Sequence, residues 1–177
     1  MARPSNRDRV LDAYETLLVD GAGVTVTLDA VAEAAAVSKG GLLYHFPSKE
    51  ALVDGLCGRL RERAAADVVR LRAAPEGPVA YWVRTATGEA EIGIGRTYQA
   101  ALGLAGTGQP GARRAIADVE RGWTTALEDL IGDPVVARVV RLVGDGRYLE
   151  SLTGLPGDED DAAVVALLES LLDRPSP

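Results

Sequence analysis

The sequence has few of the residues from which catalytic and metal sites are built. Among its 177 residues there is one cysteine, Cys57, and one histidine, His45. A single cysteine cannot form an internal disulfide, and this pair offers neither a metal cluster nor a nucleophile with its base. We therefore expect no catalytic residues, no metal and no cofactor, and we expect that the protein is not an enzyme.

Long apolar runs are missing as well. No stretch approaches the ~20 apolar residues that cross a bilayer. The first residues lead directly into a charged pattern at Arg7, without the apolar segment of a signal peptide. We expect a soluble, cytoplasmic protein with no membrane partner.

Aromatic residues make up only 5% of the chain, although apolar residues make up 47%. Alanine, leucine and valine must therefore fill most of the core, and alanine and leucine propagate helices well. No alternating stretch is long enough to indicate a sheet. The composition predicts an all-α fold.

Positive charge is also scarce. The net charge is −7, and residues 1–50 carry five Lys/Arg against seven Asp/Glu. Net charge governs long-range attraction and non-specific affinity, but it does not decide whether a local surface fits a groove. The balance predicts modest non-specific binding to nucleic acid and leaves specific contacts open.

Helical spacing of apolar residues predicts a first helix over 7–19, with Ser5 or Asn6 as its cap. A long helix follows Ser48, from Lys49 to about Arg72, and breaker residues 74–78 end it. We expect about nine helices in all, with the later ones at roughly 78–91, 94–105, 111–131, 134–153 and 159–173.

Two short helices lie between these longer ones. Thr27 can cap a helix whose apolar residues include Leu28 and Val31, a turn follows at about 36–38, and Ser38 can cap a second helix from Lys39 to His45. Two short helices within a three-helix unit form a helix-turn-helix, which presents its second helix to the DNA major groove.

The second short helix has the chemistry of a DNA contact. Ser38, Lys39, Gly40 and Gly41 offer a hydroxyl, an ammonium and free N–H groups at a helix N-terminus. Adjacent glycines weaken an isolated helix by ~1 kcal/mol each, and a close approach of backbone to DNA would account for them.

The two leucines that follow, Leu42 and Leu43, must divide between the core and the groove, where an apolar side chain can meet a thymine methyl. Tyr44, His45 and Lys49 suit phosphate contacts. Core packing remains the alternative for Tyr44 and a structural role the alternative for His45, whereas Phe46, just before a proline, is expected in the core.

Residues 27–52 closely resemble the signature of TetR/AcrR-type transcriptional regulators, most specifically in Tyr44-His45-Phe46 followed by Lys49-Glu50 and Leu52. The match extends over about residues 7–55. The resemblance implies a homodimer with a helix-turn-helix DNA-binding domain at 1–48 and a ligand-binding and dimerisation domain at 49–177. It also implies a repressor of a palindromic operator in double-stranded DNA that an unknown, largely apolar effector releases. The DNA-binding residues it implies are Thr27, Ser38, Lys39, Gly40, Gly41, Leu42, Tyr44, His45 and Lys49.

The C-terminal half carries weaker patterns. Large side chains on successive helices could line an apolar cavity, although core packing is the simpler interpretation for each. The residues are Tyr81, Trp82, Tyr98, Leu102, Trp123 and Leu127. Broad apolar faces on the last two helices predict a two-fold dimer interface. Its candidates are Val136, Val139, Val140, Val143, Val164, Leu168, Leu171 and Leu172.

One further motif does not fit its usual context. Residues 106–111 match G-x-G-x-x-G, but a dinucleotide site needs that loop between a strand and a helix, and no strand is expected here.

The main alternative function is a small-molecule-binding dimer with weak or lost DNA binding, which the acidic charge favours.

Overall fold

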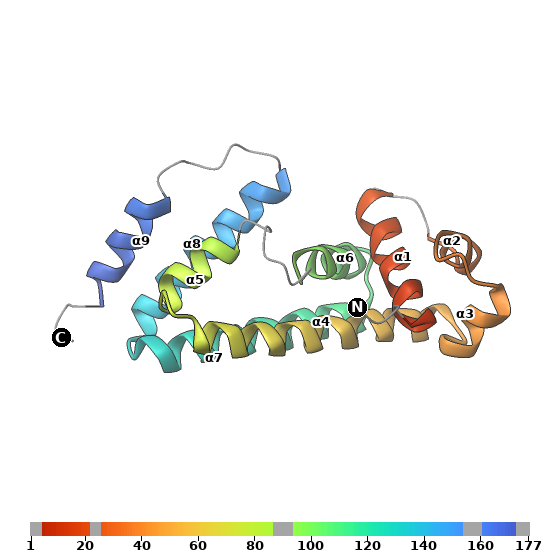
Figure 1. Cartoon of the computed structure of the whole chain (residues 1–177), viewed down its shortest axis with the longest axis horizontal. Helices are drawn as coiled ribbons and strands as arrows, with labels where there is room; N and C mark the ends of the chain where they lie inside the picture. Colours follow the sequence, from red (N-terminus) through yellow and green to blue (C-terminus); the bar gives the residue numbers. More distant parts are fainter. Residues whose placement is uncertain (1–4, 22–25, 87–93, 154–160, 173–177) are drawn as a thin grey trace. The chain divides into compact units, whose positions relative to one another are not determined.

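The computed structural model describes residues 5–21, 26–86, 94–153 and 161–172. These residues form nine α-helices, as the sequence predicts, and no strand occurs among them (Figure 1). The helices are α1 (Asn6–Asp20), α2 (Leu28–Ala34), α3 (Lys39–His45), α4 (Lys49–Ala73), α5 (Pro78–Thr85), α6 (Ile94–Gly106), α7 (Pro110–Ile131), α8 (Pro134–Thr153) and α9 (Asp161–Ser170). None of the described helices has the length and apolarity that a membrane span requires. The expected ends of the helices at 78–91 and 159–173 lie partly outside the described residues.

Four of these helices begin at a hydroxyl cap, which sets their first residue. The side chains of Ser5, Thr27, Ser38 and Ser48 each accept a hydrogen bond, 3.0–3.2 Å long, from the backbone N–H three residues later. Each bond satisfies one of the N–H groups that a helix N-terminus leaves without a partner. Helix α1 therefore starts after Ser5, the first of the two caps considered from the sequence.

The chain divides into two compact units. The first contains residues 1–62 and 96–118, and the second contains residues 63–95 and 119–177. Helices α4 and α7 each begin in the first unit and end in the second. This division follows packing and does not test the functional boundary at residue 48, which stays a prediction.

In the first unit, α1, α2 and α3 pack on one another. An ionic network on the buried Arg59 of α4 holds α1 in place. The Arg59 guanidinium donates to Asp12 at 2.5 Å, to Glu15 at 3.2 Å and to the Asp8 carbonyl at 3.1 Å. Glu15, itself 4% exposed, also accepts a hydrogen bond from Thr97 of α6 at 3.0 Å. Because buried charges need such partners, the network fixes how α1 lies on α4 and α6.

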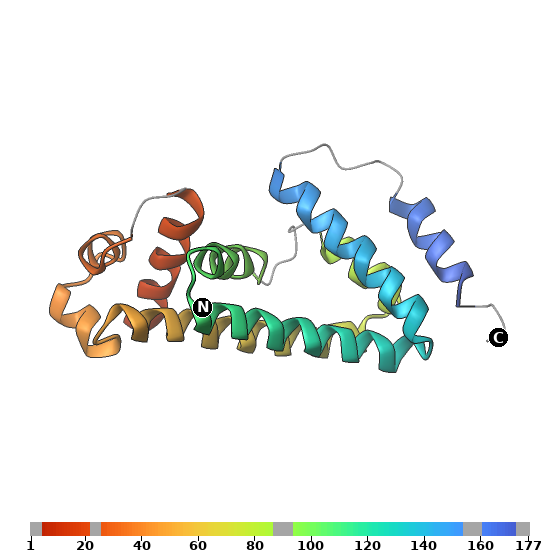
Figure 2. The same cartoon turned by 180° about the vertical axis from the view of Figure 1, so that it is seen from behind.

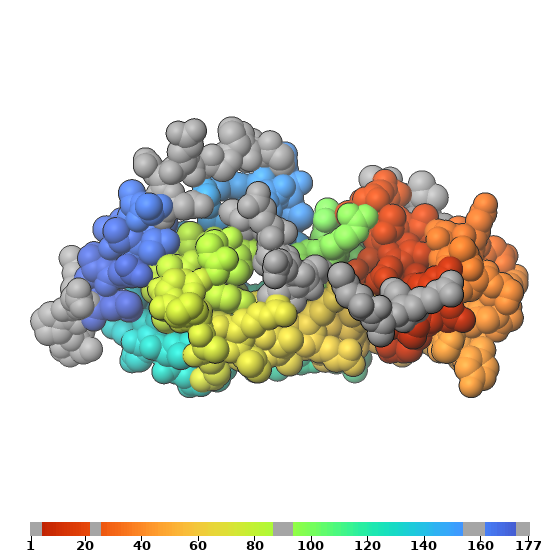
Figure 3. All heavy atoms as spheres, in the orientation of Figure 1, coloured from red at the N-terminus to blue at the C-terminus, as the bar shows by residue number. Residues whose placement is uncertain are grey.

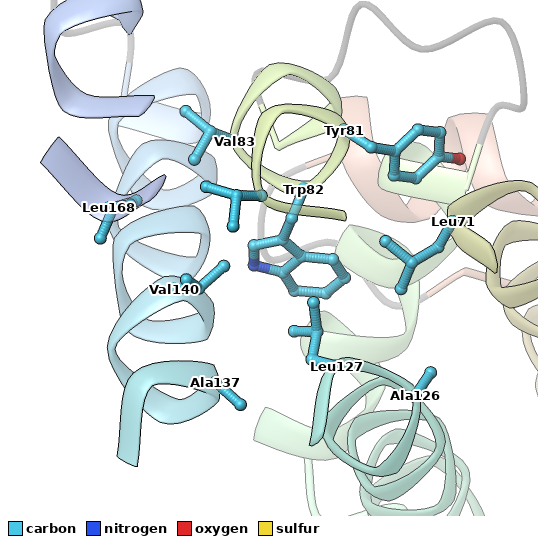
Figure 4. Close-up of a cluster of buried hydrophobic side chains, with 10 residues drawn as sticks. Leu71, Tyr81, Trp82, Val83, Ala126, Leu127, Ala137, Val140 and Leu168 are labelled. Atoms are coloured by element: carbon cyan, nitrogen blue, oxygen red, sulfur yellow. The ribbon is translucent and has the colours of Figure 1, made fainter. Parts of the chain in front are cut away.

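In the second unit, α5 packs against both α8 and α9 (Figures 1 and 2). The core around these helices centres on Trp82, whose indole lies between Leu71, Leu127 and Val140 (Figure 4). A Cβ at position 144 of α8 would lie 2.2 Å from the Trp82 indole nitrogen. Glycine at 144 therefore makes room for the tryptophan.

Candidate functional site

Helix α3 has one side in the core and the other in the open. Leu42 is completely buried and Phe46, just after the helix, is 3% exposed. Tyr44 is 85% exposed and Leu43 36% exposed, and Lys39 and Gly40 also face outward. Figure 3 shows the orange surface that α2 and α3 form on the first unit. The exposed side of α3 can therefore meet another molecule without rearrangement of the core.

The turn before α3 is held in an uncommon backbone conformation. Ala36 has φ = 51°, in the left-handed region that glycine usually occupies. The N–H of Ala36 donates to the Glu33 carbonyl and the N–H of Val37 to the Ala32 carbonyl, both at 3.0 Å. These two bonds form a Schellman motif, which ends α2 and aims the chain into α3.

Arg9 of α1 stabilises the same turn. Its Nη2 donates to the Ala35 carbonyl at 2.6 Å and to the Ala36 carbonyl at 3.1 Å. Carbonyls at a helix C-terminus lack partners within the helix, and a cation there is also favoured by the helix dipole. Arg9 could not be recognised from the sequence, because its partners lie 26 and 27 residues away in the chain.

The two glycines of α3 have different surroundings. A Cβ at position 41 would lie 3.2 Å from the Ser38 hydroxyl, which accepts the Gly41 N–H at 3.0 Å. A Cβ at position 40 would meet no protein atom within 4 Å. The protein's own packing therefore accounts for glycine at 41 but not at 40.

The charged groups near α3 are only partly available. Lys39 Nζ lies 2.8 Å from a carboxylate oxygen of Asp29 on α2, and both side chains are more than half exposed. Lys49, at the first turn of α4, has no acidic partner within ion-pair distance among the described residues. The rings of Tyr44 and His45 meet edge to face, with centroids 5.1 Å apart.

Most of the residues predicted to bind DNA lie on this surface. Leu42 does not: its side chain is fully buried, so Leu43 takes its place among the candidates. The residues exposed to solvent are Thr27, Ser38, Lys39, Gly40 and Tyr44, and those partly exposed are Gly41, His45 and Lys49.

The predicted ligand-binding residues divide between the two units. Tyr81, Trp82, Trp123 and Leu127 belong to the Trp82 core of the second unit. Tyr98 and Leu102 lie on α6 in the first unit, where Leu102 is 39% exposed.

Asp67, on α4, is a residue of the second unit whose role the sequence does not indicate. It is 5% exposed and accepts hydrogen bonds from the Tyr81 hydroxyl at 2.7 Å and the Trp123 indole N–H at 2.9 Å. Burial and the Asp67 carboxylate raise the pKa of the Tyr81 hydroxyl, which remains a donor. In sequence, Asp67 is one of four acidic residues on a long helix, and nothing local marks it as buried.

The predicted dimer residues also divide. Val140 and Leu168 are in the core of the second unit, and Val136, Val143, Val164 and Leu171 are partly buried against it. Val139 and Leu172 are exposed. The large apolar side chains that α8 and α9 leave most exposed are others: Val135, Leu142, Leu149 and Leu167, at 58–70%. Part of the predicted dimer face is buried within the single chain, because α8 and α9 pack on α5.

Family models match both halves of the chain. Residues 12–56 match the model described as "Bacterial regulatory proteins, tetR family", and residues 76–173, more than half of the chain, match "Tetracyclin repressor-like, C-terminal domain". The chain belongs to the TetR family. As a TetR-family protein it is a helix-turn-helix DNA-binding transcriptional regulator with a C-terminal ligand-binding domain, and not an enzyme.

Solved TetR-family structures share this fold. A family member from Streptomyces coelicolor A3 is 25% identical, with a TM-score of 0.72 over 95% of this chain and 98% of that one. The multidrug binding protein EbrR in complex with malachite green is 26% identical, with a TM-score of 0.70 and the same coverage. Its ethidium complex is 24% identical over 94% and 98% of the two chains, with a TM-score of 0.65. No curated protein sequence matches the chain.

Proposed function

We propose that this TetR-family protein is a homodimeric repressor that binds a palindromic operator and leaves it when a small organic molecule binds. The observation that carries the DNA-binding part is the outward side of α3, where Tyr44 is 85% exposed above a fully buried Leu42. An aromatic side chain that is this exposed contributes little to the packing of a single chain. A recognition helix needs exposed side chains on the side that faces DNA and buried side chains that anchor its other side.

The proposed contacts are of two kinds. Thr27, Ser38, Lys39, Tyr44 and Lys49 would bind phosphates and set the orientation of α3, since such contacts position a protein without reading sequence. Gly40, Gly41, Leu43 and His45 would lie nearest the bases. Lys39 would exchange its Asp29 partner for a phosphate.

The dimer would form through the exposed side of α8 and α9. Val135, Val139, Leu142 and Leu149 recur at helical spacing along α8 and are all 38–70% exposed. Leu167 and Leu172 add apolar surface at α9 and just after it. A second copy would bury both sets in an isologous interface. Two recognition helices about 34–36 Å apart would then read successive major-groove segments of a palindrome.

The effector is proposed to bind in the residue 49–177 domain. EbrR, which shares the fold, binds malachite green in its solved complex. The proposed apolar lining comes from aromatic residues of the Trp82 core, among them Tyr81 and Trp123.

Selection of bound sequences from random double-stranded DNA, followed by fluorescence anisotropy on the selected site, tests the DNA-binding proposal. We expect a palindrome. Tyr44→Phe and Lys49→Ala should each weaken binding roughly 10-fold or more, because a hydrogen bond to a charged group contributes about 1.5–3 kcal/mol. Lys49→Ala should also lower the salt slope by about 1 per phosphate contact.

Glu62→Ala, on the exposed side of α4, is a matched control for surface substitution and should leave the affinity unchanged. The second candidate function is a ligand-binding dimer without effective DNA binding, which the −7 net charge and the Lys39–Asp29 pair favour. Failure to recover any retained sequence at low salt would support that alternative and overturn the repressor proposal.

A further inference from the structure

Asp67 is a buried acidic residue without a cationic partner among the described residues. The residue is 5% exposed, and no Lys or Arg of the described residues forms an ion pair with it. Its two oxygens accept from neutral donors, the Tyr81 hydroxyl and the Trp123 indole. The other buried ionic residue of α4, Arg59, does have partners of opposite charge, the carboxylates of Asp8, Asp12 and Glu15.

The surroundings of Asp67 are aromatic. Trp123 meets Trp82 edge to face, with ring centroids 5.6 Å apart and an angle of 71° between the planes. Tyr81 and Trp82 are almost fully buried, whereas Trp123 and the neighbouring Val68 of α4 are only partly buried. The aromatic cluster thus reaches the protein surface at Trp123, the residue whose indole N–H donates to the Asp67 carboxylate.

An unpaired carboxylate in such a place is costly, because burial removes water that two neutral hydrogen bonds replace only in part. A positive charge brought next to it recovers Coulomb energy in a medium of low dielectric constant. The same cation gains from the electron-rich face of an indole, an attraction that strengthens when water is excluded.

We propose that Asp67, Tyr81 and Trp123 form the recognition site for a hydrophobic organic cation, with Asp67 neutralising its charge and Trp123 stacking on it. This proposal rests on the proposed effector function of the same domain and names the chemical class of the effector. Tyr81 is a positioning residue here, because its hydroxyl donates to one oxygen of the Asp67 carboxylate and so fixes the orientation of that carboxylate.

Other charges of the second unit favour the same class. The Trp82 indole N–H donates to the Arg141 carbonyl, at 3.4 Å. The Arg141 guanidinium is already paired with Glu120 and Asp145. Burial raises the pKa of Asp145. Arg84 lies over the Tyr81 ring, 5.8 Å from its centroid, and is itself paired with Glu76. An anionic ligand would therefore meet carboxylates and arginines that already have acidic partners, while a neutral ligand would gain at most a hydrogen bond from Asp67.

Two ions of nearly the same size and shape test the proposal: tetraphenylphosphonium, a cation, and tetraphenylborate, an anion. Trp82 and Trp123 are the only tryptophans of the chain, so intrinsic fluorescence reports directly on this cluster. Titration of the full-length wild-type protein should give a Kd for the phosphonium at least tenfold lower than for the borate. Equal affinity for the two ions, preference for the borate, or no binding of the phosphonium overturns the proposal.

The variant Asp67→Asn keeps the shape of the side chain and removes its charge. It should weaken phosphonium binding at least tenfold and leave borate binding unchanged or improved. Asp129→Asn is the matched control, since Asp129 lies on α7 of the same unit and is exposed, paired with Arg72. The control should bind the phosphonium as the wild type does. Unchanged phosphonium binding by Asp67→Asn would remove Asp67 from the site, and the wild-type comparison of the two ions remains decisive if that variant does not fold.

DNA binding gives an independent readout of the underlying function. A wild-type protein that binds its selected operator but not the phosphonium contradicts only the cation proposal. A protein that binds the phosphonium but no DNA contradicts only the repressor proposal. Each result therefore counts against one of the two.

Discussion

At the scale of single residues, Gly40 and Gly41 show how neighbours in sequence can be glycine for different reasons. Position 41 lies against the Ser38 cap, whereas position 40 is open to solvent and has helical backbone. Glycine in a helix is less stable than alanine by up to about 1 kcal/mol. Glycine at position 40 lowers helix stability, and no contact within the chain requires it. This agrees with a close approach that is made only in the DNA complex.

Gly40→Ala should therefore separate stability from binding. We expect the free energy of unfolding to rise by up to about 1 kcal/mol in urea titrations, because the methyl group meets no atom within 4 Å. Operator affinity, measured by anisotropy, should fall roughly tenfold or more as the methyl keeps the α3 backbone away from DNA.

Gly103→Ala is the matched control, since Gly103 is exposed on α6 and its added methyl would also meet nothing within 4 Å. It should stabilise the protein to a similar extent and leave operator affinity alone. Full operator affinity in Gly40→Ala would mean that the backbone at Gly40 does not approach DNA.

At the scale of helices and turns, the N-caps are features that can be predicted from the sequence. Thr27, Ser38 and Ser48 act on N–H groups three residues away, so local sequence is enough to place the starts of α2, α3 and α4. The left-handed Ala36 could not be predicted, because alanine carries no sequence signal for that conformation.

Features that depend on distant partners were also beyond the sequence. The partners of Arg59 are 44–51 residues away, and a helical pattern shows that Arg59 lies on α4 but not that it is buried. In the same way, helical spacing marked Val140 and Leu168 as apolar without showing that α5 would cover them. Burial against one neighbour rather than another is decided by tertiary packing.

The turn offers a test at this scale. Ala36→Gly should raise the free energy of unfolding by about 0.5–1 kcal/mol, because the left-handed conformation costs an L-residue about 1–2 kcal/mol and glycine's larger unfolded-state freedom returns part of this. Urea unfolding followed by circular dichroism measures the change.

Ala34→Gly provides the opposite sign two residues earlier. Ala34 is exposed and helical, so glycine there should lower the free energy of unfolding by about 0.5–1 kcal/mol. If both variants are destabilised alike, the strain assigned to Ala36 is not present in solution.

At the scale of the whole molecule, the exposed side of α8 carries apolar side chains that packing within the single chain does not cover. Val135, Leu142 and Leu149 are 58–70% exposed, and Gly146 beside them is also open. Large apolar groups gathered on one face indicate an interaction surface, and small residues let two helices approach closely. A second copy of the chain is the partner that the proposed function requires.

Leu142→Glu should convert the proposed dimer to a monomer without unfolding it, because Leu142 is 58% exposed in the single chain. Light scattering after size-exclusion chromatography measures the mass. Operator affinity should fall by about 100-fold or more, since each half-site contact then loses the effective concentration that its partner provides.

Val69→Glu is the matched control, because Val69 is 66% exposed on α4. It should leave both the mass and the operator affinity unchanged. A Leu142→Glu protein that still has the mass of the dimer would place the interface elsewhere.

Three cationic side chains in the first unit already have partners within the protein, which affects how the regulator would find its site. Arg9 is bound to carbonyls of the turn, Arg59 is enclosed by carboxylates, and Lys39 is paired with Asp29. Sliding along DNA depends on cations that hold any phosphate regardless of sequence. Because these three described cations are already engaged, the protein would spend little time on unrelated DNA and would reach its operator mostly from solution. A small number of molecules per cell would then suffice, because few would be retained elsewhere on the chromosome.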